Sequence, residues 1–277
     1  EDGVVYVGAT NHVLYALDAG SGVLLWYYPS QGEILASPVV KDGLVFFSAD
    51  NDSVYDLVHR LYALDARSGM PFWIYDTDSW TPSAPAVGED AIYLGGYQRE
   101  VNALDKYTGE ELWSFTASNI VFSSPQAAED MVLFASINGW VHALDAATGK
   151  PVWSRQLSGF IWLAPSNGDG NLYVCSRDNT MNALVLETGD QLWSYKGDDF
   201  LSCSPLSRGE LVCAFDARGK VCILDSHSGE RVGILLTPYD FTAQPLIEGG
   251  MLFARSSDGL VRAYPLPEDE LMLGSKE

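Results

Sequence analysis

Residues 143–153 read Ala-Leu-Asp-Ala-Ala-Thr-Gly-Lys-Pro-Val-Trp, and similar strings recur along the chain. The shared pattern is Ala-x-Asp-x-x-Thr/Ser-Gly-x-x-x-Trp, with nearly complete further copies at residues 16–26, 63–73 and 103–113. Each closing tryptophan lies four residues after a glycine. The tryptophans advance by one step of 47 residues and then by steps of 40, and the two sets are Trp26, Trp73, Trp113, Trp153 and Trp193 with Gly22, Gly69, Gly109, Gly149 and Gly189. A fixed period of this length indicates an array of one supersecondary unit.

A single repeat, residues 119–156, contains four short runs of apolar, β-branched and aromatic residues. The runs span residues 120–126, 131–135, 140–144 and 152–155, and Gly, Asp, Asn and Ser separate them. Runs of this length and composition favour β-strands, and no window shows a sustained helical period. We label the four runs A, B, C and D and expect four antiparallel strands, as in one blade of a β-propeller.

Counting these runs predicts an all-β fold, a seven-bladed β-propeller. Runs B and C each occur seven times, and runs A and D occur six times clearly. A seventh D run is expected at residues 270–273, with Leu273 at the tryptophan position. The first A run is missing, so a segment before residue 1 or the terminal tail is expected to supply it. Residues 1–277 are then one propeller domain, and part of an eight-bladed ring is the alternative.

The turn before each tryptophan has a definite chemistry. In the quoted repeat Asp145 can accept hydrogen bonds from the turn amides and from the Thr148 hydroxyl. Gly149 can adopt a positive φ without steric cost. Ala143 is expected to leave room for a neighbouring ring. Because one indole is buried per repeat, a Trp→Ala change is expected to cost about 3–5 kcal/mol of stability.

The charge balance narrows the range of partners. The 37 acidic and 16 basic residues give a formal net charge of −21. Such a chain repels phosphate backbones and anionic lipid, so we expect no nucleic acid partner and no membrane insertion. The excess of acidic residues either serves solubility, or it indicates a basic surface on a protein or peptide partner or an acidic cation site. No apolar run approaches the ~18 residues of a membrane span.

The four cysteines, Cys175, Cys203, Cys213 and Cys222, form no CxxC pair, which indicates neither a metal site nor a redox motif. If a hairpin turn spans residues 216–219, Cys213 lies opposite Cys222. The pair is then either a disulfide or two small buried hydrophobic side chains.

The repeated string resembles the tryptophan-docking repeat of the pyrroloquinoline-quinone-like β-propellers, over nearly the whole chain. That family contains quinone-dependent dehydrogenases and non-catalytic relatives, such as the outer-membrane assembly lipoprotein BamB and the sensor domains of some bacterial kinases. The resemblance favours an exported or envelope-associated location. Later repeats depart from the pattern, with these residues in place of its Ala, Asp or Trp: Val185, Ile223, Gly233, Pro265 and Leu273.

The dehydrogenase branch of the family implies features that this sequence lacks. It implies eight blades with large insertions, a vicinal disulfide and a calcium shell, whereas no two cysteines are adjacent and the starts of the A runs are mostly apolar. The four histidines, His12, His59, His142 and His227, fall in no HExxH motif, and there is no GxSxG motif or P-loop. We therefore expect no enzyme activity, cofactor or metal.

The candidate binding surface is the rim formed by the B–C and D–A connections. Marker prolines follow the same 40-residue step, at Pro38, Pro85, Pro125, Pro165, Pro205 and Pro245, and aromatic residues gather three to five positions before them. Exposed aromatic residues are typical of recognition surfaces, although these rings could instead pack between blades. The candidates are Trp80, Phe122, Phe160, Trp162, Phe200 and Phe241, of which Trp80 and Trp162 are the best candidates for exposure.

The same rim carries acidic residues and the one insertion. The acids are Asp76, Asp78, Asp198, Asp199 and Asp240, and residues 49–60 are expected to form a long B–C loop. Acidic and amide side chains in that loop suggest calcium, but the glycine of an EF-hand is missing. These side chains are Asp50, Asn51, Asp52 and Asp56.

We therefore expect a non-catalytic scaffold that binds a protein or peptide on this rim. A propeller domain that senses a small molecule is the alternative, and a quinone-dependent dehydrogenase is the least favoured reading.

Overall fold

The computed structural model describes residues 2–53, 56–81, 83–241 and 243–266, without the side chains of residues 52–58. These residues contain β-strands, turns and bends, and no helix. The seventh D run expected at residues 270–273, with Leu273, lies outside the described residues.

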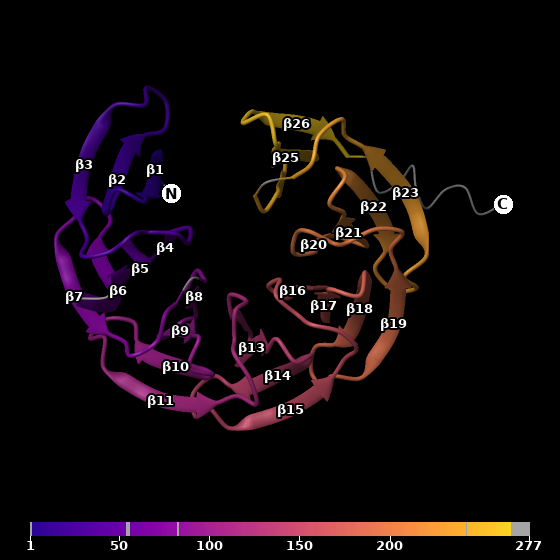
Figure 1. Cartoon of the computed structure of the whole chain (residues 1–277), viewed down its shortest axis with the longest axis horizontal. Helices are drawn as coiled ribbons and strands as arrows, with labels where there is room; N and C mark the ends of the chain where they lie inside the picture. Colours follow the sequence, from indigo (N-terminus) through magenta and orange to yellow (C-terminus); the bar gives the residue numbers. More distant parts are fainter. Residues whose placement is uncertain (1, 54–55, 82, 242, 267–277) are drawn as a thin grey trace. The chain divides into compact units, whose positions relative to one another are not determined.

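The strands form seven antiparallel sheets in which neighbours along the chain are neighbours in the sheet (Figure 1). Five sheets have four strands, and the first and last have three. Sheets in which consecutive strands pair in chain order are typical of propeller blades. The predicted fold class, an all-β, seven-bladed β-propeller, is confirmed. The strands of the first four sheets are β1 Val4–Ala9, β2 Val13–Asp18, β3 Leu24–Pro29; β4 Val39–Lys41, β5 Leu44–Ser53, β6 Asp56–Asp65, β7 Pro71–Asp76; β8 Ala86–Val87, β9 Ala91–Gly95, β10 Glu100–Asp105, β11 Glu111–Thr116; β12 Gln126–Ala128, β13 Met131–Ala135, β14 Trp140–Asp145 and β15 Pro151–Gln156. Those of the last three are β16 Ser166–Gly168, β17 Asn171–Ser176, β18 Thr180–Val185, β19 Gln191–Lys196; β20 Leu206–Arg208, β21 Leu211–Phe215, β22 Lys220–Asp225, β23 Arg231–Leu236; β24 Leu246–Glu248, β25 Met251–Arg255 and β26 Val261–Pro265.

The chain divides into two compact units, which we describe separately. Unit 1 comprises Glu1–Ile137 and Ala143–Pro151, and unit 2 comprises Asn138–His142 and Val152–Glu277. The B strands of the third to sixth sheets are deeply buried, since every residue of β9, β13, β17 and β21 is buried, whereas β1 and β25 are partly exposed.

The inner A strands are shorter and later than the sequence predicted. In the repeat analysed above, β12 begins at Gln126, after Pro125, instead of at residue 120. Proline has no N–H to donate to a sheet ladder, so regular pairing starts after it. The residues before each proline form a connection that leads into the inner strand.

The insertion at residues 49–60 is part of a hairpin, and the prediction of a loop was wrong. β5 and β6 are ten residues long each, and their pairing runs from Leu44↔Asp65 to Ser53↔Asp56. Extending the ladder gives the added backbone groups partners, which a loop would leave to solvent. The Asp52 and Asp56 side chains, part of the suggested calcium site, lie outside the described side chains.

Each indole docks against the following sheet, as Trp73 illustrates. Trp73 is 9% exposed, and its Nε1–H donates to the backbone oxygen of Lys106 at 3.0 Å. A Cβ placed on Gly109 would lie 2.7 Å from the indole, and Gly109 has a φ of +73°. Glycine is therefore required both by the turn and by the ring. The same bond, at 2.9–3.1 Å, joins Trp26 to Ala66, Trp113 to Ala146, Trp153 to Leu186 and Trp193 to Ser226.

The alanine of the repeat faces the tryptophan of its own sheet, because the register pairs Ala63 with Trp73. The space for the docked ring is thus created chiefly by the glycine of the next repeat. This differs from the prediction that the alanine leaves room for a neighbouring ring.

The aspartate turn is confirmed. Asp65 Oδ1 accepts hydrogen bonds from the Ser68 amide and the Ser68 hydroxyl, both at 2.7 Å. The Ser68 hydroxyl and amide bonds lower the pKa of Asp65, because they stabilise its charged form. The equivalent aspartates, which make the same amide bond, are Asp18, Asp105, Asp145 and Asp225.

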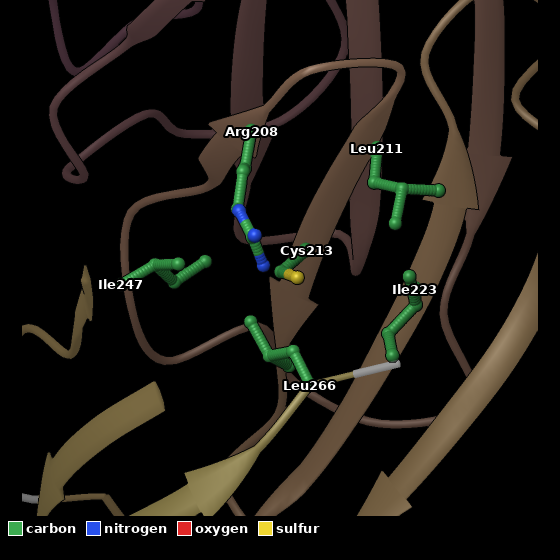
Figure 2. Close-up of a pocket in the computed structure, with 6 residues that line it drawn as sticks. All are labelled: Arg208, Leu211, Cys213, Ile223, Ile247 and Leu266. Carbon is green, nitrogen blue, oxygen red and sulfur yellow. The ribbon is translucent and has the colours of Figure 1, made fainter. Parts of the chain in front are cut away.

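In the sixth sheet the tryptophan is missing, and a small pocket lies at that place (Figure 2). Gly233 pairs with Ile223 in the register that pairs Trp193 with Ala183 one repeat earlier. The pocket has a volume of about 10 Å³, close to the minimum for one water molecule. Without rearrangement it does not hold a metabolite, so it gives no support to the small-molecule alternative. Its lining residues are Arg208, Leu211, Cys213, Ile223, Ile247 and Leu266.

The cysteine pairing considered above is corrected by the register. Cys213 pairs with Ile223, and Cys222 pairs with Ala214. The turn is one residue longer than predicted, since the Asp216 amide donates to the Lys220 carbonyl at 2.9 Å. Neighbouring strand positions face opposite sides of a sheet, so the two thiols point apart. All four cysteines are free and buried, and burial raises the pKa of Cys213 to about 12.

His142 is a buried histidine in β14. It is 6% exposed, its Nδ1 lies 2.8 Å from the Ser154 hydroxyl, and its ring stacks on Trp140 at 6.1 Å. Burial lowers the pKa of His142 to about 4, because the charged imidazolium loses its hydration there.

The glycine requirement is tested by comparing Gly109→Ala with Gly22→Ala. Both glycines have a φ near +70°, but only at Gly109 does a described ring lie against the added Cβ. We expect Gly22→Ala to cost about 1 kcal/mol from the backbone conformation alone. Gly109→Ala should cost about 2–4 kcal/mol, because overpacking against Trp73 is added. Urea unfolding measures both, and equal losses would contradict the docking role of Gly109.

The buried His142 predicts a loss of stability in mild acid. The unfolded chain binds a proton at this residue below a pH of about 6.5, whereas the folded chain binds it only near 4. The free energy of unfolding should therefore fall by up to about 3 kcal/mol between these two values. Urea unfolding of the wild type and of His142→Gln at several pH values measures this. A wild type that loses no more stability than His142→Gln over this range would refute the assignment.

Candidate functional site

The B–C and D–A connections are joined by a backbone hydrogen bond that recurs in six repeats. In the third sheet the Tyr97 amide donates to the Trp80 carbonyl at 3.0 Å. The donor lies 17 residues after the acceptor, and the acceptor lies five residues before the marker proline. Five of the six donors lie in the B–C turn, and the sixth, Asp50, lies within β5. The other pairs are Asp50 with Glu33, Ile137 with Ile120, Arg177 with Phe160, Ala217 with Phe200 and Ser257 with Asp240. In each of these six repeats, the bond therefore places the two bonded residues at the same end of the sheet.

Side chains before the marker prolines alternate in burial. The position four before the proline is buried in every repeat, and its occupants are Ile34, Thr81, Val121, Ile161, Leu201 and Phe241. The positions five and three before it flank a buried side chain and are more exposed, as extended backbone requires. Pro82 and Thr242, at the position three before, lie outside the described residues.

Phe241 is therefore a core residue, and its inclusion among the rim candidates is corrected. It is 8% exposed, and its ring packs edge-on against Phe215 at 5.7 Å. The sequence analysis grouped it with exposed positions because it is next to Asp240, but the alternation turns it inward.

In unit 1, three rings gather at this end of the sheets, and we call Trp80, Tyr97 and Phe122 the unit 1 aromatic cluster. Their centroids are 5.8–6.0 Å apart, in tilted and edge-to-face arrangements that aromatic pairs prefer. Tyr97 is 50% exposed, and the other two rings are half-buried. Tyr97, in the B–C turn, was missed by the sequence analysis. Its place between the B and C runs, on the rim that carries the other candidates, was the available signal.

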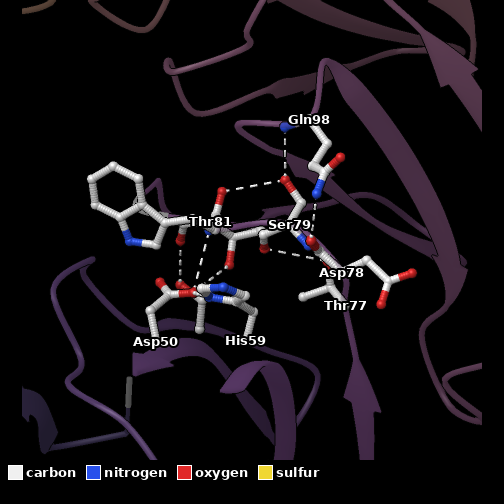
Figure 3. A network of polar contacts seen from close by, with 9 residues as sticks. Asp50, His59, Thr77, Asp78, Ser79, Thr81 and Gln98 are labelled. Atoms are coloured by element: carbon white, nitrogen blue, oxygen red, sulfur yellow. Dashed lines mark hydrogen bonds and ion pairs between the residues drawn. The ribbon is translucent and has the colours of Figure 1, made fainter. Parts of the chain in front are cut away.

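A buried polar network holds the backbone beside Trp80 (Figure 3). The Thr81 amide and hydroxyl donate to Asp50 Oδ1 at 3.3 and 3.5 Å, and His59 Nδ1 lies 2.9 Å from the same oxygen. The Ser48 hydroxyl donates to the Thr81 carbonyl at 3.0 Å. Thr81 and Asp50 are 2% and 5% exposed, so these bonds are shielded from water. The β5–β6 hairpin thereby fixes the residue that follows Trp80.

The residue that precedes Trp80 is held from the other side, by the B–C turn of its own sheet. The Gln98 amide donates to the Ser79 hydroxyl, and Gln98 Nε2 donates to the Asp78 carbonyl, both at 3.0 Å (Figure 3). A Cβ on Gly96 would lie 2.3 Å from the Ser79 hydroxyl oxygen, so glycine is needed there. Trp80 therefore stands on a segment anchored at both flanks.

Unit 2 has an aromatic group of its own, in which an arginine takes part. The Arg177 guanidinium lies 4.4 Å from the centroid of the Trp162 ring and 5.7 Å from that of Phe200. Both distances are within the range of a cation–π contact. Trp162 is 52% exposed, Phe200 37% and Phe160, which bonds the Arg177 amide, 56%. We call Phe160, Trp162, Arg177 and Phe200 the unit 2 aromatic cluster.

Several of the acidic residues at these connections are paired within the chain. Asp76 binds Arg60, Asp198 binds Lys220 at 2.6 Å, and Asp199 binds Arg218 at 2.5 Å. The hydrogen bond from Lys220 lowers the pKa of Asp198. Asp78 and Asp240 are exposed and form no ion pair with residues that the structure describes.

Within the described ranges, no three His, Cys, Asp or Glu side chains come close enough together to hold a metal ion. No helix of membrane-spanning length and hydropathy occurs in the same residues.

A family model described as "Outer membrane protein assembly factor BamB" matches residues 1–96, 59–139 and 100–262. The chain belongs to the BamB family. No curated protein matches the sequence.

Two solved structures show the same fold as this BamB family member. BamB from Moraxella catarrhalis is 20% identical with a TM-score of 0.66, and the match covers 96% of this chain and 95% of that one. The computationally designed protein Ika8 is 17% identical with a TM-score of 0.85, over 96% of this chain and 81% of that one. At these identities the likeness concerns the fold alone. The BamB-like, pyrroloquinoline-quinone-like propeller resemblance of the sequence is confirmed.

Proposed function

We propose that residues 1–277 act as one non-catalytic propeller domain that binds a protein or peptide through the aromatic side chains of its B–C and D–A connections. The observation that carries this proposal is the unit 1 aromatic cluster. Tyr97 exposes half of its surface, and the adjoining Trp80 stands on backbone held by a buried hydrogen bond at Thr81 and a partly buried one at Ser79. Tyrosine and tryptophan are enriched among the residues that dominate binding energy at protein interfaces.

The polar network supports binding because it prepares the surface in advance. Ordering a loop on association costs free energy, and a segment already fixed by Asp50, Thr81 and Gln98 avoids part of that cost.

The family description supports a protein partner. The members are described as assembly factors for outer membrane proteins, and assembly is carried out on other proteins. A partner of the present chain that is itself a protein agrees with that description.

The state of the nucleophilic side chains supports the non-catalytic part of the proposal. Burial raises the pKa of Cys203 to about 11 and that of Cys213 to about 12, which keeps these thiols protonated and unreactive at neutral pH.

Substitution of the exposed ring tests the proposal. Partners captured by the purified chain from an envelope extract are quantified by mass spectrometry for the wild type, Tyr97→Ala and Phe72→Ala. Phe72 is a matched control, because it is 57% exposed but lies on the outer strand β7. We expect Tyr97→Ala to reduce capture about tenfold, the loss of roughly 1.4 kcal/mol at an interface hot spot. Phe72→Ala should not change it. Undiminished capture by Tyr97→Ala would show that the partner binds elsewhere.

A further inference from the structure

Arginine side chains stack on aromatic rings twice in unit 2, once from a B–C turn and once from the start of strand β26. Arg177 lies over Trp162 at 4.4 Å. Arg262 lies over Tyr239 at 4.3 Å, and two of its nitrogens bond the carboxylate of Asp258 at 2.8 and 2.5 Å. Within one unit, the chain thus stacks guanidinium groups on aromatic rings close to its own B–C turns.

The turn residue of the unit 1 aromatic cluster, Tyr97, corresponds to Arg177 by position in the repeat, and Trp80 corresponds to Phe160. Tyr97 and Arg177 are two 40-residue steps apart, and each donates its amide to the carbonyl 17 residues earlier. In unit 2 this turn position supplies a cation that stacks on rings. In unit 1 the same position supplies another ring, and the arginine of that turn, Arg99, stands two residues later.

From this correspondence we propose that the unit 1 aromatic cluster binds an arginine side chain of a partner protein, with the guanidinium stacked on Trp80 and Tyr97. This inference rests on the proposed function and specifies what the cluster recognises. The internal contact of Arg177 with Trp162 shows the geometry, a guanidinium over the face of an indole near a B–C turn. The partner's arginine supplies to unit 1 the group that unit 2 carries itself.

The charge of unit 1 favours such an occupant. Unit 1 contains 20 acidic side chains against six basic ones, whereas unit 2 contains 17 against ten. An excess of one sign raises the local concentration of opposite charge and speeds its association. Asp78, two residues before Trp80, is exposed and adds to this potential.

The chemistry selects arginine over lysine. The guanidinium is planar and weakly hydrated, so it stacks flat on an aromatic face and loses little hydration in doing so. The ammonium of lysine is compact and strongly hydrated. Tryptophan is the strongest aromatic partner for a cation, and Trp80 is in the cluster.

The probe for the test is the blocked tripeptide acetyl-Gly-Arg-Gly-amide, compared with versions that carry citrulline, lysine or leucine in place of arginine. Citrulline keeps the shape and loses the charge. Binding is followed by NMR at the Trp80 indole N–H, identified as the resonance that disappears in Trp80→Phe. The wild type and Tyr97→Leu are titrated in parallel with Tyr97→Phe, which keeps the ring.

We expect the arginine peptide to bind at least about threefold more tightly than the citrulline peptide, the effect of an exposed cation–π contact. The lysine peptide should fall between them. Tyr97→Leu should lose this selectivity and Tyr97→Phe should keep it. Equal binding of the arginine, citrulline and leucine peptides, or no shift of the Trp80 resonance, would overturn the inference. The proposed function would then still stand or fall on the Tyr97→Ala capture experiment, whose readout does not depend on arginine.

Discussion

The docking of an indole from one sheet onto the glycine turn of the next is the interaction on which the rest of this structure depends. At the seam of Trp73 and Gly109, one contact satisfies a buried indole N–H, covers a large apolar ring and requires a glycine. Because a blade cannot bury its faces alone, its stability depends on such seams. The sixth sheet shows the converse, since Gly233 stands at the tryptophan position and a pocket lies there.

The repeated seams position the candidate site, because they fix each sheet against the next in the same way. Five D–A connections then meet a B–C turn through the same amide-to-carbonyl bond, and the sixth meets strand β5 at Asp50. The alternation before the marker prolines turns one side chain inward and its neighbours outward, as Phe241 and Phe160 illustrate. What differs between repeats is the identity of the outward residues. Aromatic residues gather there in both units, and an arginine joins them in unit 2.

Much of the architecture could be predicted from the sequence, because periodicity and turn chemistry are local. The 40-residue step, the aspartate turn and the glycine before each tryptophan predicted the sheets and their order. Features that depend on register could not be read in this way. The turn after β21 is one residue longer than predicted, and this difference places Cys213 and Cys222 on opposite faces of the sheet. Residues 49–60 were expected to form a loop, but β5 pairs with β6 there and makes a hairpin. At the site, the rings before the prolines were found by their step. Tyr97 and the network of Asp50, His59 and Thr81 were missed, because they are brought to Trp80 by contacts between sheets.

The account is tested most directly by a double-mutant cycle across one seam. The free energy of unfolding is measured for the wild type, Trp73→Ala, Gly109→Ala and the double variant. If the glycine is needed because the ring lies on it, removing the ring should reduce the cost of Gly109→Ala to that of its backbone conformation alone, about 1 kcal/mol. A Gly109→Ala penalty that is the same with and without Trp73 would contradict the account.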